Sequence, residues 1–217
     1  FEISKSRFFA ETGWDKENLN GKAVLEIGCG PGRFSNVVLK HTNATLYSID
    51  YSDAVTANWR NNYKVSPDRF FLFQASVYET PFPDNSFDKV FCFGVLQHTP
   101  DFEASVKAMI AKAKPGAEII VDFYPINGWW TKLNAKYILR PFTKRMSHDK
   151  LLSMIENNID WLLKASLGLR RVGLAVLARF LPICELDGMI ANSDEELRDL
   201  LVLDTFDQYS PQHDHPQ

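Results

Sequence analysis

A glycine-rich turn constrains the fold of this chain more than any other part of its sequence. Residues 24–27 have a pattern typical of a buried strand, Gly28, Gly30 and Gly32 follow at alternate positions, and residues 33–39 have a helical pattern. Glycine accepts a positive φ and has no Cβ, so the backbone can bend sharply and a ligand can lie directly against it. In an open parallel sheet such a turn lies at the carboxyl end of a strand, where ligand crevices form. The stretch therefore predicts a ligand site in an α/β fold.

Several ligands that bind at glycine turns are disfavoured here. The sixth position counted from Gly28 is Arg33, whereas the dinucleotide fingerprint needs glycine or alanine there for close helix packing. Arg33 and the lack of a Tyr-x-x-x-Lys pair therefore disfavour an NAD-dependent reductase. The turn is followed by no Gly-Lys-Ser/Thr, which disfavours a phosphate loop. A turn that serves only the fold remains an alternative.

A carboxylate follows the second predicted strand. Residues 45–49 are apolar and end at Asp50, which lies 22 positions after Gly28, close to the spacing at which a strand-end carboxylate reaches a ribose diol. An ionised carboxylate suits two hydroxyl donors because charge-assisted hydrogen bonds are the stronger kind. The alternative is that Asp50 or Ser52 caps the helix that follows.

The remaining pattern predicts a two-part organisation. Further strands are expected at residues 69–75, 89–93 and 118–123, with a helix at 102–113 that buries Ala104, Val106, Met109 and Ile110. Five strands separated by helices predict a doubly wound α/β sheet within residues 1–125. Residues 126–217 are expected to form a helical unit with a polar tail. Its helices are predicted at residues 147–164, 168–181 and 193–203, the last one opened by a capping box of Ser193 and Glu196.

Composition narrows the class of protein. A chain of 217 residues that is 45% hydrophobic can bury one sizeable core and a helical addition. Its net charge of −3 gives no electrostatic footprint for nucleic acid. The three cysteines are too few for a disulfide framework, and the sequence shows no signal peptide or spanning apolar run, so a cytoplasmic location is expected. A solvated tail, not a metal site, is expected at His213, Asp214 and His215. The basic residues of segment 168–181 leave contact with a membrane surface open.

Two further segments carry a resemblance to a known family. Residues 80–88 read Thr-Pro-Phe-Pro-Asp-Asn-Ser-Phe-Asp, and residues 94–101 read Gly-Val-Leu-Gln-His-Thr-Pro-Asp. Together with Glu26 ahead of the glycines, they resemble the class I S-adenosylmethionine-dependent methyltransferases, although Thr80 and Gln97 stand where that family usually has leucine and histidine. The resemblance runs from residue 24 to residue 123. It implies a Rossmann-like, mostly parallel sheet with helices on both faces, whereas the C-terminal strand hairpin usual in the family is expected to be missing here. The helices predicted after the fifth strand exceed what the sheet needs for cover, so they are expected to form an inserted lid over the substrate.

The resemblance also implies a cofactor and an activity. The cofactor would be S-adenosyl-L-methionine, and its methyl group would pass to a small-molecule acceptor by in-line displacement; the alternative is a non-catalytic protein that binds S-adenosylmethionine or S-adenosylhomocysteine. The implied cofactor contacts are Glu26, Gly28, Cys29, Gly30, Gly32, Asp50, Tyr51, Ser76, Val77 and Phe93. Ser76 replaces a frequent acidic residue, so adenine recognition is expected to use the backbone near Val77. His98 and Tyr124 are the catalytic candidates, and His98 is either a general base or a hydrogen-bonded wall residue.

The N-terminal residues 1–20 leave two possibilities open. Phe8, Phe9 and Trp14 are compatible with a helix that covers one edge of the core. By resemblance, the same segment could close over the cofactor, with Arg7 or Trp14 near its methionine end.

Overall fold

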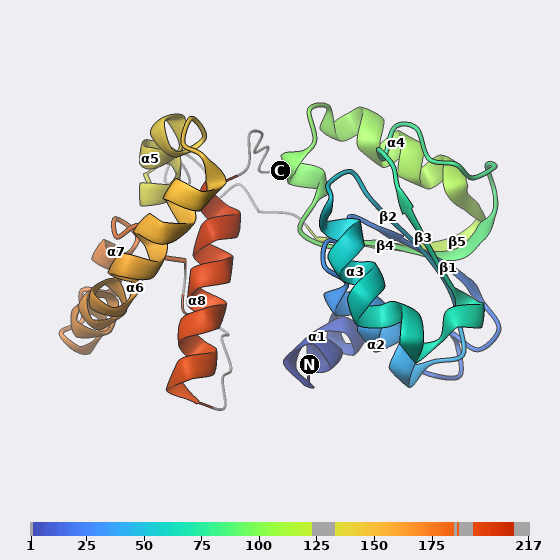
Figure 1. Ribbon diagram of the computed structural model, residues 1–217, viewed down its shortest axis with the longest axis horizontal. Coiled ribbons are helices and arrows are strands. Elements are labelled where there is room, and N and C mark those ends of the chain that lie inside the picture. Colours follow the sequence, from blue (N-terminus) through green and yellow to red (C-terminus); the bar gives the residue numbers. More distant parts are fainter. Residues whose placement is uncertain (1, 123–132, 185, 187–192, 211–217) are drawn as a thin grey trace. The chain divides into compact units, whose positions relative to one another are not determined.

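The computed structural model of the chain describes residues 2–122, 133–184, 186 and 193–210 (Figure 1). Two compact units divide the chain between Tyr124 and Pro125. The predicted catalytic Tyr124 and the tail residues His213, Asp214 and His215 lie outside the described residues. The two units are taken separately below.

The first unit is built on a five-stranded parallel sheet in the order β3-β2-β1-β4-β5. The strands are β1 (Ala23–Ile27), β2 (Thr45–Asp50), β3 (Phe70–Gln74), β4 (Phe87–Cys92) and β5 (Ala113–Val121). Strand order reverses between β1 and β4, and at such a switch point the carboxyl ends of the strands open a crevice for a ligand. The predicted doubly wound fold is confirmed, and the glycine turn leaves β1 at this edge.

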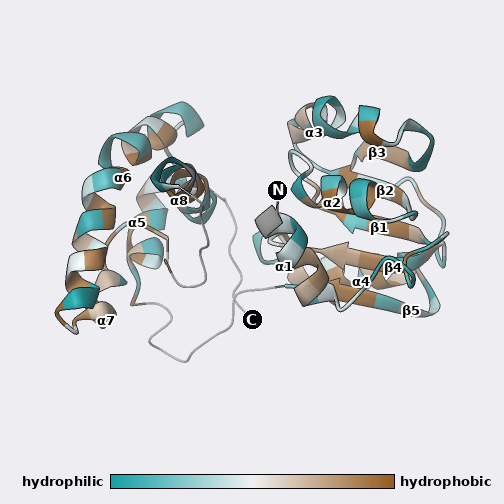
Figure 2. Cartoon of the chain, turned by 90° about the horizontal axis from the view of Figure 1, so that it is seen from below, coloured by the Kyte–Doolittle hydropathy of each residue, from teal (hydrophilic) through white to brown (hydrophobic). Residues whose placement is uncertain are grey.

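Helices lie on both faces of the sheet (Figure 2). They are α1 (Glu2–Thr12), α2 (Arg33–His41), α3 (Ala54–Asn62) and α4 (Phe102–Lys112). Side chains alternate along a strand, so Val24 of β1 packs with Phe34 of α2 in one core cluster, while its neighbour Leu25 packs with Met109 of α4 in the other. Glu26 belongs to the same face as Val24 and therefore lies under α2.

The end of α4 and the start of β5 differ from the sequence prediction. Residues 114–117, which separate the predicted helix from the predicted strand, lie within β5, whose pairing with β4 shifts between Phe87 and Lys89. Gly116 has a φ of 81°, which allows this irregularity. The predicted burial of Ile110 is wrong: its side chain is 52% exposed, because Ser105 and Met109, one helical turn apart, face the sheet.

The second unit is helical, with α5 (Ala135–Thr143), α6 (His148–Arg171), α7 (Ala175–Ala178) and α8 (Asp194–Tyr209). An apolar stripe on α6 packs against α8 in a core of its own; its members include Leu151, Ile155, Ile159 and Leu162 on α6 and Leu201 and Val202 on α8. None of the helices in the described ranges combines the length and apolarity needed to cross a bilayer.

Helix boundaries in this unit were predicted less well. α6 continues through Gly168, where two helices were expected, because buried Ser166 extends its packed stripe. α8 begins after Ser193, as the capping box predicts, but extends past residue 203 because Thr205 and Tyr209 are buried. The sequence pattern gave no helix for α5, which carries Pro141 inside it.

Candidate functional site

The glycine turn is held by the end of β2. The backbone N–H groups of Gly28 and Cys29 both donate to the carbonyl oxygen of Ile49, at 2.8 and 3.0 Å. Gly28, Gly30 and Gly32 have φ values of 74°, 50° and 89°, a region that side chains rarely adopt. Gly32 precedes the first residue of α2, so the turn leads directly into a helix N-terminus.

The three glycines differ in what surrounds them. A Cβ placed on Gly28 would lie 2.1 Å from Cγ2 of Val95, and one on Gly32 would lie 2.2 Å from Oδ1 of Asn58. A Cβ on Gly30 would meet nothing within 4 Å. Packing therefore requires glycine at Gly28 and Gly32, whereas Gly30 faces open space that a ligand can occupy.

The structure brings Asp50 against this open position. Its Oδ2 accepts the backbone N–H of Gly30 at 2.7 Å, and its Oδ1 accepts the N–H and hydroxyl of Ser52 at 2.8 and 2.6 Å. A carboxylate has about four acceptor positions, so three are used and room remains for a ligand hydroxyl. The N-cap position of α3 belongs to Asp53, so Asp50 does not cap that helix.

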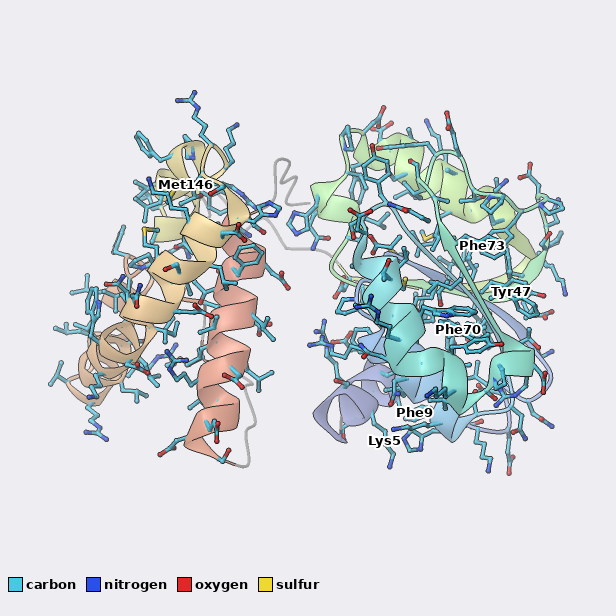
Figure 3. The ribbon with its side chains drawn as sticks, viewed as in Figure 1. Lys5, Phe9, Tyr47, Phe70, Phe73 and Met146 are labelled. Carbon is cyan, nitrogen blue, oxygen red and sulfur yellow. The ribbon has the colours of Figure 1, made fainter. Side chains whose placement is uncertain are left out.

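A groove beside Asp50 contains two of the predicted cofactor residues. Tyr51, which is 81% exposed, and Ser76 both line it. Its other lining residues are Ser52, Asp53, Leu72, Phe73, Gln74, Ala75, Glu79 and Pro81. Phe73 of β3 and Tyr47 of β2, both labelled in Figure 3, each pack edge-on against Phe82, at 5.3 and 5.8 Å between ring centroids. The groove thus lies at the carboxyl ends of β2 and β3, where the adenine contacts were predicted.

Glu26 lies beneath the turn. It is 2% exposed, and its Oε2 accepts the hydroxyls of Ser35 and Ser48 at 2.5 and 2.6 Å. Burial raises the pKa of Glu26 to about 7, partly opposed by the two serine hydrogen bonds. Its carboxyl group therefore links β1 to α2 and β2, the elements next to the turn. Direct contact with the cofactor stays a prediction.

The side chains of Cys29, Val77 and Phe93 are also buried. Burial and the nearby Glu26 raise the pKa of the Cys29 thiol, which keeps it protonated. Phe93 packs edge-on against Phe34 at 5.1 Å between ring centroids. Any cofactor contact of these residues stays a prediction.

An asparagine network that the sequence reasoning missed ties α3 to the turn. The Nδ2 of Asn62 donates to the carbonyl of Gly32 and to Oδ1 of Asn58, both at 2.9 Å, while its Oδ1 accepts Nδ2 of Asn36 at 2.7 Å. Asn58 donates in turn to the hydroxyl of Ser35, the residue that binds Glu26. The spacing of Asn58 and Asn62, which places both on one helix face, was a usable signal.

The loop after β4 carries the predicted catalytic histidine. His98 ends a short 3₁₀ turn (Leu96–His98), is half-buried, and donates its backbone N–H to the carbonyl of Val95 at 2.8 Å. The backbone N–H of Gly94 donates to Oδ1 of Asp122 at the end of β5. His98 thus lies in the loop at the carboxyl end of β4, and its chemical role stays a prediction.

The N-terminal helix covers the core and also reaches this edge. Phe8 is fully buried and Trp14 nearly so, and Trp14 donates its indole N–H to Glu118 at 2.8 Å. Arg7 donates to Oδ2 of Asp122 at 2.9 Å. Burial raises the pKa of Asp122, opposed by the bonds from Gly94 and Arg7. The covering role is observed, whereas closure over a cofactor stays a prediction; Asp122 was missed because it has no motif around it.

Comparison with known proteins supports the resemblance found in the sequence. A family model described as a methyltransferase domain matches residues 25–121, which span β1 to β5 and the whole edge described above. Residues 25–121 are therefore similar to methyltransferase domains, in agreement with the resemblance to the class I S-adenosylmethionine-dependent methyltransferases. The family's cofactor fits this site, because Gly30 leaves open space beside an Asp50 carboxylate that keeps acceptor capacity.

The chain has relatives with different acceptors. The chain is 34% identical over 113 residues to a tRNA U34 carboxymethyltransferase of Nautilia profundicola, an alignment that covers 51% of this chain and 37% of that protein. It is 28% identical over 176 residues to a ubiquinone biosynthesis O-methyltransferase of Pseudomonas fluorescens, with 68% of this chain and 74% of that protein covered. The chain thus spans little more than a third of the tRNA-modifying relative.

Solved structures support the methyltransferase fold. A putative methyltransferase from Bacillus halodurans superimposes with a TM-score of 0.54 at 15% identity, covering 64% of this chain and 59% of that one. The YcgJ protein of Bacillus subtilis gives a TM-score of 0.51 at 18% identity, covering 70% and 59%.

Proposed function

We propose that the protein is an enzyme that transfers the methyl group of S-adenosylmethionine to a small-molecule acceptor. The proposal rests on one contact: the backbone N–H of Gly30 donates to Oδ2 of Asp50 at 2.7 Å. A carboxylate therefore lies beside a backbone position that has open space for a ligand. The similarity of residues 25–121 to methyltransferase domains supports the choice of cofactor.

The extent of the matches supports a small acceptor. The alignment with the ubiquinone biosynthesis relative covers 68% of this chain, which is more than the first unit contains, and so it reaches into the second unit. The tRNA-modifying relative aligns over 113 residues, close to the length of the shared domain. The part of the chain outside the shared domain therefore favours the small-molecule methyltransferases, and the net charge of −3 agrees with this.

The chain's own residues would bind and orient. When bound, S-adenosylmethionine supplies a methyl group on a positively charged sulfur. Asp50 would accept a ligand hydroxyl while its bond to Gly30 fixes the turn, and Tyr51 would flank the groove beside it. An acceptor hydroxyl must also lose a proton, and His98 is the candidate that the loop after β4 offers. If orienting the acceptor behind the methyl group is sufficient for transfer, no base is needed and His98 only lines the site.

Transfer of label distinguishes the acceptor classes. We would incubate the protein with methyl-labelled S-adenosylmethionine and a cell extract, then separate small molecules, RNA and protein. Label in the small-molecule fraction, absent with Gly30→Val, is the expected result. Label in RNA or protein would contradict the small acceptor, and binding without any transfer would favour the non-catalytic alternative.

A further inference from the structure

The region around the end of α6 exposes a dense apolar surface, here called the 167–180 segment. Six of its large apolar side chains are exposed: Leu167, Val172, Leu174, Val176, Leu177 and Phe180. Val172 and Val176 are the most open, at 69% and 70%. Isolated exposed apolar residues are common, whereas a group of them within one short segment favours an interaction site.

This segment is ordered by its own hydrogen bonds. Gly173, at a φ of 76°, ends α6, and the N–H of Leu174 donates to the carbonyl of Leu169 at 2.8 Å, as in a Schellman motif. The carbonyl of Arg179 accepts the N–H of Ala135, which joins the segment to α5 at 2.9 Å. The apolar side chains are therefore held outward by a fixed backbone.

The charge around the segment has one sign. Residues 161–184 contain four basic residues and no aspartate or glutamate, although the whole chain has a net charge of −3. Lys164 and Arg171 are exposed within this stretch. Apolar side chains next to exposed cations match a surface that offers both hydrocarbon and negative charge.

We propose that the 167–180 segment docks the protein on an anionic lipid bilayer surface. Val172, Val176 and their neighbours enter the boundary between headgroups and acyl chains, while Lys164 and Arg171 lie among acidic headgroups. This attachment is peripheral, because the segment is far too short to span a membrane. It is independent of the methyl acceptor and of cofactor binding.

Vesicle sedimentation tests the attachment with the full chain. The probes are vesicles of phosphatidylcholine alone and vesicles with about a third phosphatidylglycerol. We expect binding to the anionic vesicles that weakens as salt rises, and little binding to the neutral ones. Val172→Asp/Val176→Asp and Arg171→Glu should each lower binding about tenfold, while thermal unfolding stays as in the parent.

Matched controls measure how much vesicle binding is lost when negative charge is added elsewhere on the protein. Ile110→Asp and Lys107→Glu change exposed residues of α4 in the first unit and should leave vesicle binding unchanged. Absence of binding to anionic vesicles at low salt, or equal losses in the controls, would overturn the proposal. Sedimentation velocity provides a further check: a dimer that Val176→Asp converts to a monomer would assign the surface to self-association instead.

Discussion

At the scale of single residues, the three glycines of the turn share a positive φ but lack side chains for different reasons. Gly28 and Gly32 are required by neighbouring protein atoms, whereas Gly30 borders open space. The family resemblance implied that all three contact the cofactor. The structure shows that neighbouring atoms exclude a side chain at two of the three positions, and substitutions can test whether the third binds the cofactor.

Gly28→Ala should lower stability first. Its new methyl group would meet Val95 in a backbone region that alanine disfavours, so a loss of about 2–3 kcal/mol in the free energy of unfolding is expected. Urea denaturation checks this against Gly21→Ala, which has a φ of 68° and open surroundings. Equal losses in the two variants would show that the contact with Val95 is unimportant.

Glu26 should make stability depend on pH. Its pKa in the folded protein, about 7, lies above the ordinary value of 4.5, so between these pH values the folded state holds more protons than the unfolded state. The free energy of unfolding should therefore fall as pH rises through this window, by up to about 3 kcal/mol. Glu26→Gln removes the titration, so its stability relative to the parent should rise from pH 4.5 to pH 7. A difference that stays constant with pH would contradict this assignment.

At the scale of elements, α3 supports the turn through its asparagines. Asn62→Ala would leave the partners of three buried hydrogen bonds unsatisfied, on Gly32, Asn58 and Asn36, and should cost about 2–4 kcal/mol. The neighbouring Asn61 donates to the carbonyl of Pro31 from an exposed position, so Asn61→Ala should cost less than about 1 kcal/mol. Denaturant unfolding of both variants measures the difference, and similar costs would argue against the network.

His98, in the loop after β4, has two possible roles that a substitution can distinguish. We expect a wall residue: His98→Ala should raise KM or lower stability and leave the ascending limb of the pH–rate profile in place. If His98 is the general base, the same variant should lose on the order of a hundredfold to ten-thousandfold in kcat, and that limb should disappear. Comparing the two pH–rate profiles on a true substrate decides between these roles.

At the scale of the whole molecule, the strands of the sheet were predicted more accurately than the helix boundaries of the second unit. Each strand from β1 to β4 ends within two residues of its predicted end, because apolar runs bounded by turn residues locate buried strands well. α6 was divided at Gly168 because glycine usually marks a helix end, whereas its packing against α8 outweighs that preference.

The candidate site was predictable where a motif carried it. Gly30 and Asp50 were found from spacing alone, and the structure brings them together. The asparagine network, Asp122 and the contact of Gly28 with Val95 depend on which elements pack side by side, and local sequence does not encode that.

The central claim is that Gly30 and Asp50 form one cofactor site, and S-adenosylmethionine affinity measured by calorimetry tests it most directly. Gly30→Val should abolish detectable binding, and Asp50→Ala should weaken it by about 1.5–3 kcal/mol, roughly ten- to a hundredfold. The matched controls Gly21→Val and Asp68→Ala alter an open positive-φ glycine and an exposed aspartate elsewhere and should bind as the parent does. Unchanged affinity in folded Gly30→Val and Asp50→Ala proteins would contradict the account.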